Sequence, residues 1–570
     1  MAFRVADLIV DILIAHGVDR AFSVPGESFL ALLDALYERD EIDLVTCRHE
    51  GSASLAAVAD AKLTGRAAVV MASRGPGASN AAIGLHVASQ EAIPLVLLVG
   101  QVETPNLNRD AVQEIDTARA FNGLTKWSVR LETAAQVPEM MARAFSVALS
   151  GTPGPVVIEL PADVLEMDAG LLSASFHGVA RAEPSRAAVE QAATLLSDAE
   201  RPILLIGGEC RTAEFREDLV ALSEHWNVPV AVTTKMQDQY PNDHRLWIGH
   251  LGFFLSPAHV GLFERADLIV AVGTRLGDLS SLGFRFPRKS PTSQPLIHVY
   301  PDPNAIGTHF HTDLPIVASA HPFVRSSLEL PVVMRERDEW IEAVAKVREA
   351  VHGWPERRIP SADVLGHAVA AIAKLSRADA VVTTDSGNFA AWVHRIFRFR
   401  PSARLLGSAC GAMGSGVPSA LSAGLRYPKR QVIAFCGDGG FLMTGNELAT
   451  AVARRLNITI VISNNQSYGT IRTHQERAFP KRPWGTDLSN PDFAALARAF
   501  GAQGYTITNA AQAGEIVPEA LSAKGPGVIE VRSDVRQTID RSLAAASRPA
   551  NLSAGSRGRA SLISATTHHR

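Results

Sequence analysis

Two polar residues, Asp438 and Asn465, each follow an apolar segment that is typical of a buried strand. Asp438 lies in the glycine-rich segment 437–440 after the run 432–435, and Asn465 follows the run 458–462. If these strands are parallel neighbours, both side chains lie at one sheet edge, where ligands of open α/β sheets bind. Carboxylate, amide and carbonyl oxygens are ligands for Mg²⁺, and glycines let backbone N–H groups approach a diphosphate. The alternative is a plain tight turn beside an Asn-Asn loop.

A second carboxylate, Glu50, follows Arg-His at the end of a strand expected over 43–46. An Ala-rich helix is predicted to follow over 52–63. A zinc-protease motif HExxH is excluded, because Ala53 stands where the second His is needed. One interpretation of Glu50 is a helix cap, since a carboxylate is favourable at a helix N-terminus.

The elements that position these residues alternate between short β-branched runs and Ala/Leu-rich helical stretches. Runs that are apolar on both faces and separated by helices are typical of central strands in parallel sheets. The predicted fold class is α/β, with doubly wound parallel sheets. The runs are 68–71, 95–99, 156–160, 203–206, 268–272, 432–435 and 458–462. The stretches 68–99 and 432–462 share a strand, glycine turn, helix and strand. This is either the common βαβ pattern or a sign of two related domains flanking a third.

Loss of periodicity at 167–185 and around 330–360 predicts three domains and a tail. We expect an N-terminal domain over 1–167, a central nucleotide-type domain over 186–335 and a C-terminal domain over 361–535. The last part, 536–570, is rich in Ala, Ser and Arg without apolar periodicity. We expect it to be disordered or to extend a lid. For the C-terminal domain we also predict a helix over 446–455 and a turn at 437–440.

Bulk composition excludes several classes of protein. The chain has 570 residues, 55 Lys and Arg against 58 Asp and Glu, and a net charge of −3, which gives no support for nucleic acid or acidic membrane as a partner. The four cysteines form no CxxC pair, so we do not expect a disulfide scaffold. The expected location is the cytoplasm, which is reducing. The run 5–14 reads as an amphipathic helix rather than a signal peptide, and no apolar run is long enough to span a membrane. Neither a P-loop nor a GxSxG motif occurs.

The spacing of GDG in 437–439 and Asn-Asn in 464–465 resembles the motif of thiamine-diphosphate enzymes. Over about residues 3–535 the chain is similar to their acetolactate synthase branch. The resemblance implies thiamine diphosphate, with Mg²⁺ held by Asp438, Asn465 and the carbonyl of Ser467. It implies catalytic roles for Glu50, Gln113 and Gly26. The implied cofactor-binding residues are Pro25, Glu50, Asn80, Gly387, Asn388, Phe389, Ala412, Met413, Gly437, Asp438, Gly439, Gly440, Asn465, Ser467, Tyr468 and Gly469.

By the same resemblance, Glu50 hydrogen-bonds the aminopyrimidine ring of the cofactor and stabilises the tautomer that deprotonates the thiazolium carbon. The resulting ylid adds to a 2-oxo acid and takes up the electrons of decarboxylation. The aldehyde unit then passes to a second carbonyl compound. The resemblance further implies branched-chain amino acid biosynthesis and a dimer or tetramer, in which Glu50 of one chain faces the Asp438 site of another.

The chain departs from acetolactate synthases at four positions that the family places near the second substrate. These are Val112, Leu279, Thr470 and His474, where the family has Phe, Arg, Met and Trp. Loss of the Arg removes a carboxylate clamp and should change the acceptor. The alternatives are a 2-oxo acid decarboxylase or lyase, a sulfoacetaldehyde- or acyl-CoA-handling relative, and, from another class, an inactive cofactor-binding subunit.

The central domain raises the question of FAD. The segment 203–211 is a predicted strand followed by a glycine turn, Arg275 matches an Arg near FAD in the flavin-keeping branch, and Asp302 ends a strand that could hold an adenosine ribose. Two interpretations stay open: a bound FAD, or a nucleotide-type fold that holds no ligand.

Overall fold

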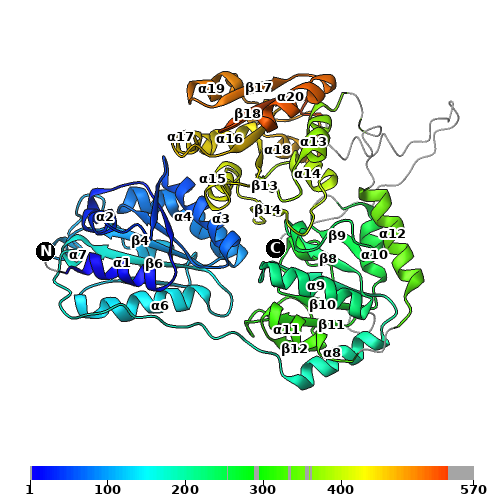
Figure 1. Cartoon of the computed structure of the whole chain (residues 1–570), viewed down its shortest axis with the longest axis horizontal. Coiled ribbons are helices and arrows are strands. Elements are labelled where there is room, and N and C mark those ends of the chain that lie inside the picture. The colour runs from blue at the N-terminus through cyan, green and yellow to red at the C-terminus, as the bar shows by residue number, and fades with distance from the viewer. Residues whose placement is uncertain are drawn as a thin grey trace.

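The computed structural model describes residues 3–252, 255–287, 294–331, 335–352, 359 and 362–536. The predicted tail 536–570 therefore lies outside the described residues, apart from Arg536. The chain forms three six-stranded parallel sheets, each flanked by helices, which confirms the predicted α/β class. In Figure 1 the C-terminal domain lies across the top, above the N-terminal and central domains. Within the described residues we find no helix with the length and apolarity to cross a membrane.

The N-terminal sheet has the strand order β2-β1-β3-β4-β6-β5. Its central strands β3 and β4 are completely buried because their apolar side chains face helices on both sides. The strands are β1 (Arg20–Ser23), β2 (Asp43–Thr46), β3 (Ala68–Ala72), β4 (Leu95–Gln101), β5 (Trp127–Arg130) and β6 (Pro155–Pro161). The helices are α1 (Val5–Ala15), α2 (Leu30–Tyr37), α3 (Glu50–Thr64), α4 (Gly75–Glu91), α5 (Thr117–Phe121), α6 (Val137–Leu149) and α7 (Ala162–Leu165).

An extended segment without helix or strand, 172–185, leads to the central sheet, whose order is β12-β11-β10-β7-β8-β9. In chain order this is 6-5-4-1-2-3, the dinucleotide-binding arrangement with its switch point between β7 and β10. The strands are β7 (Pro202–Ile206), β8 (Val230–Thr233), β9 (Trp247–Leu251), β10 (Leu268–Val272), β11 (Leu296–Tyr300) and β12 (Leu314–Val317). The helices are α8 (Arg186–Asp198), α9 (Ala213–Trp226), α10 (Pro257–Arg265), α11 (Ala320–Leu328) and α12 (Asp338–His352).

The C-terminal sheet has the order β14-β13-β15-β16-β18-β17, which repeats the N-terminal order 2-1-3-4-6-5. The two flanking domains therefore share one topology, which agrees with the second of the two interpretations of the repeated pattern. The strands are β13 (Val381–Thr384), β14 (Arg404–Gly407), β15 (Val432–Gly437), β16 (Ile458–Asn464), β17 (Gln503–Ile507) and β18 (Gly527–Arg532). The helices are α13 (Val364–Leu375), α14 (Ala390–Ile396), α15 (Gly416–Arg426), α16 (Asp438–Thr444), α17 (Leu448–Ala453), α18 (Gly469–Ala478), α19 (Phe493–Ala499) and α20 (Ala510–Ser522).

The expected turn at 437–440 is wrong in detail, because helix α16 begins at Asp438 directly after β15. The predicted helix 446–455 is the second part of this connection, where a short 3-10 turn precedes α17. The glycine turn expected between the runs 68–71 and 95–99 differs in the same way, since α4 begins at Gly75 with Pro76 in its first turn. Proline suits a first helical turn, where its missing N–H has no partner to lose.

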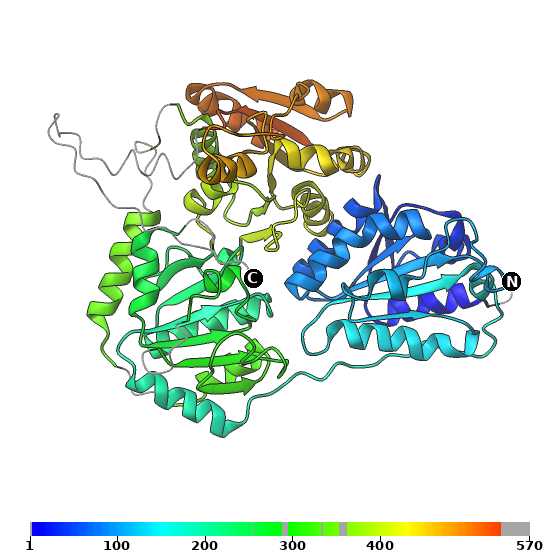
Figure 2. The same cartoon turned by 180° about the vertical axis from the view of Figure 1, so that it is seen from behind.

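The N- and C-terminal domains pack together through one continuous apolar core between α3, α4 and α15. Figure 2 shows this contact from behind, with the C-terminal domain above both others. A buried ion pair strengthens it: Nε and Nη2 of Arg426 each lie 2.6 Å from a carboxylate oxygen of Asp60. Such a two-pronged pair fixes the orientation of the two helices as well as their distance.

Candidate active site

Asp438 provides a buried carboxylate at the carboxyl end of β15. Its side chain accepts hydrogen bonds from the backbone N–H groups of Gly439 (2.9 Å) and Asn465 (3.1 Å), and from Nδ2 of Asn490 (2.9 Å). Burial raises the pKa of this carboxyl group, although the three donors favour its charged form. Within the described residues, no Lys, Arg or His forms an ion pair with Asp438. A buried acid with amide donors and no cationic side chain fits a bound metal ion as counter-charge.

Asn465 and Ser467 lie beside Asp438 in the loop that follows β16. Besides the bond from its N–H to Asp438, Asn465 accepts a hydrogen bond at Oδ1 from the N–H of Ser467 (3.0 Å). The Ser467 carbonyl accepts one bond from Gly469 N–H (2.7 Å), which leaves its second lone pair for another ligand. The buried Ser467 hydroxyl has no partner among the described residues. The structure thus brings the three predicted metal ligands together.

Asp385, at the end of β13, contacts three glycine-containing segments. Its buried carboxylate accepts N–H groups of Ser386 (2.7 Å) and Gly414 (2.9 Å). A Cβ on Gly440 would lie 2.6 Å from Asp385 Oδ2, so only glycine allows this close approach. One buried carboxylate therefore organises the segments 386–389, 412–416 and 437–440, which contain most of the predicted diphosphate-binding residues.

The segment 386–389 is anchored from both sides. Asn388 donates from its backbone N–H to the Thr470 hydroxyl (3.0 Å) and from Nδ2 to the Thr473 hydroxyl (3.3 Å), both on α18. The Ser386 hydroxyl donates to the carbonyl of Ala412 (3.0 Å), next to the half-buried Met413. Because the turn is bonded to α18 and to residue 412, its backbone has one defined conformation.

Aromatic rings pack against the glycines of this cluster. A Cβ on Gly387 would lie 2.7 Å from the Phe389 ring, and one on Gly437 3.2 Å from the same ring. Gly439 faces the Tyr468 ring, which a Cβ would approach to 2.5 Å. Tyr468 is fixed in turn by its N–H bond to the Thr486 carbonyl (2.8 Å). Glycine is required here by close packing, and the predicted cofactor residues of this domain form one continuous cluster.

A second cluster lies in the N-terminal domain around Glu50, the first residue of α3. Its Oε2 accepts a hydrogen bond from Nδ2 of Asn80 (2.9 Å) on α4. The side chain that caps α3 is His49, whose Nδ1 accepts the N–H of Gly51 (3.0 Å). The side-chain cap of α3 is thus His49, while Glu50 lies in the first turn of the helix and its carboxylate faces Asn80.

Gly26 and the start of α4 close this cluster. A Cβ on Gly26 would lie 2.8 Å from Cβ of Ser73, and one on Gly77 would lie 3.1 Å from Oε1 of Glu50. The neighbouring Pro25 is exposed. The structure thus brings the predicted residues Gly26, Glu50 and Asn80 to one edge of the N-terminal sheet.

Gln113 joins the same edge through its backbone. It adopts a left-handed conformation with φ of 64°, and its carbonyl accepts the N–H of Gly75 (2.8 Å) at the start of α4. Its loop is ordered by Glu114, whose carboxylate accepts the N–H of Asn108 (2.6 Å). The side chain of Gln113 is exposed. The left-handed backbone of Gln113 is thus held by the hydrogen bond from Gly75, and it directs the side chain away from the domain.

The Glu50 cluster and the Asp438 cluster belong to different domains of the chain. In the described part of one chain, no hydrogen bond joins Glu50 or Asn80 to Asp438 or Asn465. The two domains nevertheless meet beside Glu50, where Glu447 accepts the N–H of Arg48 (2.8 Å). We call the Glu50 cluster and the Asp438 cluster the two half-sites.

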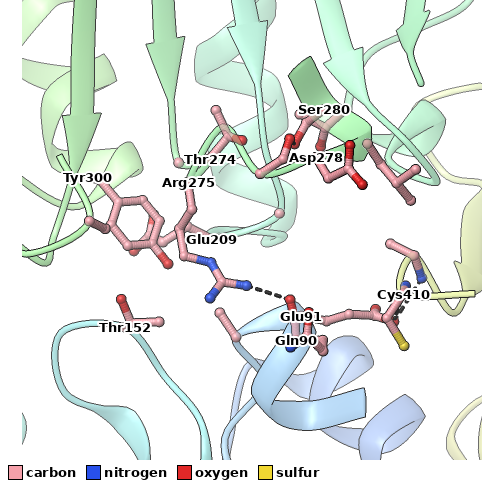
Figure 3. Close-up of a pocket in the computed structure, with 18 of the residues that line it drawn as sticks. Gln90, Glu91, Thr152, Glu209, Thr274, Arg275, Asp278, Ser280, Tyr300 and Cys410 are labelled. Atoms are coloured by element: carbon pink, nitrogen blue, oxygen red, sulfur yellow. Dashed lines mark hydrogen bonds between the residues drawn. The ribbon is translucent and has the colours of Figure 1, made fainter. Parts of the chain in front are cut away.

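A pocket of about 850 Å³ opens where the three domains meet (Figure 3). It lies at the switch point of the central sheet and includes Arg275, Tyr300 and Asp302, whereas His298 bonds instead to the carbonyl of Thr274 (2.8 Å). Arg275 donates across the pocket to the Gln90 carbonyl, and the Thr152 hydroxyl donates to Asp302 (2.7 Å). An acidic side chain at the end of β11 can accept hydrogen bonds from a ribose.

The four departures from acetolactate synthases are spread out in one chain. Leu279 lines the 850 Å³ pocket. Thr470 holds Asn388, while Val112 and His474 are exposed.

Three residues of the site were missed by sequence reasoning. They are Asp385, which directly precedes the predicted residues Gly387 to Phe389, Asn490, which belongs to no motif, and Lys235, which reaches the cluster from the central domain. A carboxylate directly before a glycine turn at a strand end was the available signal for Asp385. Contacts between domains leave no comparable local signal.

Comparison with known families agrees with this geometry. Residues 3–120, 189–326 and 385–531 match the N-terminal TPP binding, central and C-terminal TPP binding domains of thiamine pyrophosphate enzymes. The chain is 32% identical to the acetolactate synthase isozyme 2 large subunit of Escherichia coli (strain K12), over 94% of this chain and 96% of that one. It is 31% identical to the acetolactate synthase large subunit of Parasynechococcus marenigrum (strain WH8102), over 92% and 87%. It is 29% identical to the probable acetolactate synthase large subunit of Methanocaldococcus jannaschii, over 94% and 92%. The protein therefore belongs to the thiamine pyrophosphate enzymes, in their acetolactate synthase-like branch.

Proposed function

We propose that this enzyme decarboxylates a pyruvate-like 2-oxo acid with thiamine diphosphate and Mg²⁺, and transfers the aldehyde unit to a second carbonyl compound. The observation that carries the proposal is the buried Asp438, bonded to Asn465 at the ends of adjacent strands β15 and β16. The names of the relatives support an acetolactate-forming reaction and a place in branched-chain amino acid synthesis.

In this proposal the C-terminal cluster holds the metal ion and the diphosphate. Asp438, Asn465 Oδ1 and the Ser467 carbonyl supply oxygen ligands for Mg²⁺, and the segments 386–389 and 437–440 surround the diphosphate. The bound cofactor supplies a carbon nucleophile and an electron sink for decarboxylation. The chain orients that group through the turns that Asp385 fixes, which limits the motion of the reacting atom.

The N-terminal cluster supplies the proton-transfer group. Glu50 is partly buried, and Asn80 holds its Oε2, while no hydrogen bond to Oε1 is found in the described part of the chain. Oε1 can therefore hold or move a proton. Because the two half-sites belong to different domains and no hydrogen bond joins them in the described part of one chain, we propose that Glu50 of one subunit completes the Asp438 site of another. A homo-oligomer is then required for activity.

We also propose FAD in the pocket of the central domain. The dinucleotide-binding strand order, the volume of about 850 Å³ and the position of Asp302 support an adenosine-containing ligand. The test is the visible spectrum of the purified enzyme, where a bound flavin absorbs at about 450 nm. A colourless protein that gains no absorbance after FAD is added and free FAD removed contradicts this proposal.

A second function, decarboxylation without carboligation, is favoured by Leu279. An apolar side chain cannot grip the carboxylate of a 2-oxo acid acceptor as an arginine does. The enzyme would then release an aldehyde, or use an acceptor without a carboxylate.

A product screen distinguishes these functions. The full chain, supplied with Mg²⁺ and thiamine diphosphate, is incubated with pairs of 2-oxo acids and carbonyl acceptors, and products are identified by mass spectrometry. A coupled product from a 2-oxo acid supports carboligation, whereas free aldehyde alone supports the second function. Absence of decarboxylation for every donor refutes both.

A further inference from the structure

Lys235 is a buried lysine that crosses from the central domain to the candidate diphosphate site. It follows β8 with a left-handed φ of 63°, and its Nζ donates to the Thr384 hydroxyl (3.0 Å) and to the carbonyls of Asp385 (3.2 Å) and Thr384 (3.3 Å). A Cβ on Gly407 would lie 2.6 Å from Cδ of Lys235, so glycine there makes room for the lysine. The ammonium thus binds the two residues directly before the segment 386–389.

A second buried lysine at the same junction is neutralised in a different way. Lys62 of α3 lies 2.5 Å from Glu91 and also donates to the Gly407 carbonyl (2.9 Å). Glu91 further accepts the N–H of Ala409 (2.7 Å). Lys62 and Glu91 therefore form a complete ion pair that joins the N- and C-terminal domains.

Lys235 has no such ion pair in the described part of the chain. Its three acceptors are a hydroxyl and two carbonyls, while the Asp385 carboxylate is occupied by the N–H groups of Ser386 and Gly414. Burying an ammonium costs more free energy than three neutral acceptors return, and burial lowers its pKa to about 8. An apolar side chain of similar length fills the same space without this cost. Packing alone does not explain the amine.

We propose that Lys235 is a positioning residue for the cofactor diphosphate. The lysine fixes the 386–389 turn through its bonds to Thr384 and Asp385, and its ammonium places a positive charge behind that turn. A diphosphate at the front of the turn adds negative charge to that which the Asp385 carboxylate already places near the lysine. The inference rests on the proposed function, because it assumes that the Asp385 and Asp438 cluster takes the diphosphate.

The proposal predicts that cofactor binding weakens as the pH rises through about 8, since the ammonium then loses its proton. The sign follows from the charge: the protonated lysine attracts the anion and the neutral amine does not. The titratable groups that face Lys235 are Asp385, Glu91, Lys62, Cys410, His394 and Cys436. Burial lowers the pKa of His394 and raises that of Cys436, so neither changes charge between about pH 7 and 9.

The test is calorimetric titration of the cofactor-free full chain with thiamine diphosphate in excess Mg²⁺, from about pH 7 to about pH 9.5. We expect wild-type affinity to fall by about tenfold over this range. Lys235→Met should bind about tenfold more weakly at pH 7, with no dependence on pH. Lys235→Arg, which stays charged, should bind tightly throughout. Lys346→Met, which removes an exposed lysine of α12, is the control and should keep the wild-type affinity and pH slope.

Wild-type affinity and pH slope in Lys235→Met would overturn the proposal. Should that variant not fold, Lys235→Arg decides: affinity that stays high at about pH 9.5 supports the proposal, and a wild-type loss contradicts it. Asp438→Ala separates this inference from the proposed function. Unchanged binding in Asp438→Ala refutes the site itself, whereas unchanged binding in Lys235→Met alone refutes only the role of the lysine.

Discussion

The N- and C-terminal domains share one strand order but differ in the residues at the ends of equivalent strands. In the C-terminal sheet, the third strand β15 leads directly into Asp438 and the fourth, β16, into Asn465. In the N-terminal sheet the third strand β3 leads to Ser73 and the Gly75 helix start, without a carboxylate. The fold thus provides matching sheet edges, while single side chains at strand ends decide the chemistry of each edge.

The two acids of these edges also differ in their surroundings. Asp438 is 3% exposed and is surrounded by amide donors. Glu50 is only partly buried and, among the described residues, accepts one hydrogen bond, from Asn80. An acid held in place by several donors suits a fixed metal ion, and an acid with a free oxygen suits proton exchange.

The largest expected effect separates the two acids. Glu50→Gln should lower kcat by about 100-fold or more, because it removes the proton-transfer group while keeping the size of the side chain. Its affinity for thiamine diphosphate should stay close to wild type. Steady-state kinetics and calorimetry measure both quantities, with the exposed Glu139→Gln on α6 as control. Wild-type turnover in Glu50→Gln would show that Glu50 is not the proton-transfer group.

Mixing two inactive variants tests whether the edges meet between subunits. When Glu50→Gln and Asp438→Ala chains are denatured together and refolded, each mixed dimer contains one site with both substitutions and one intact site. Random pairing should then restore about a quarter of wild-type activity. The separately refolded variants serve as controls. No recovery in verified mixed dimers would place both acids in one chain.

A smaller effect concerns the contact that joins the two domains. Arg426→Met should lower the free energy of unfolding by about 3 kcal/mol, because it leaves Asp60 buried without its two-pronged partner. Arg454→Met, which removes the more exposed pair with Asp43 (2.8 Å), should cost less than about 1 kcal/mol. Urea unfolding compares the two variants. Equal losses would mean that burial does not determine the strength of this interface.

The sequence was sufficient for the fold class and for the half-site around Asp438. The runs 432–435 and 458–462 are apolar on both faces, which indicated neighbouring buried strands with Asp438 and Asn465 at their ends. The start of α16 was not predicted, because glycines at 437–440 favour a turn by propensity. Tertiary packing against Tyr468 and Asp385 selects a helix at these glycines instead.

Interactions between domains could not be read from the sequence. Lys235 stands 150 residues before Asp385, and neither residue carries a pattern that points to the other. Asn80, which bonds Glu50 within the chain, was named only by resemblance. That His49 caps α3 depends on the orientation of its ring, which helix propensity does not determine. Such contacts depend on how whole domains pack.

The most direct test of the account is a calorimetric titration of thiamine diphosphate, in excess Mg²⁺, into wild type, Asp438→Ala and the control Asp492→Ala. Asp492 is exposed and caps α19, so its loss should leave cofactor binding unchanged. We predict saturable binding to wild type and to Asp492→Ala, and no measurable binding to Asp438→Ala, because the buried carboxylate holds the metal that neutralises the diphosphate. Binding of wild-type strength to a folded Asp438→Ala would contradict the account.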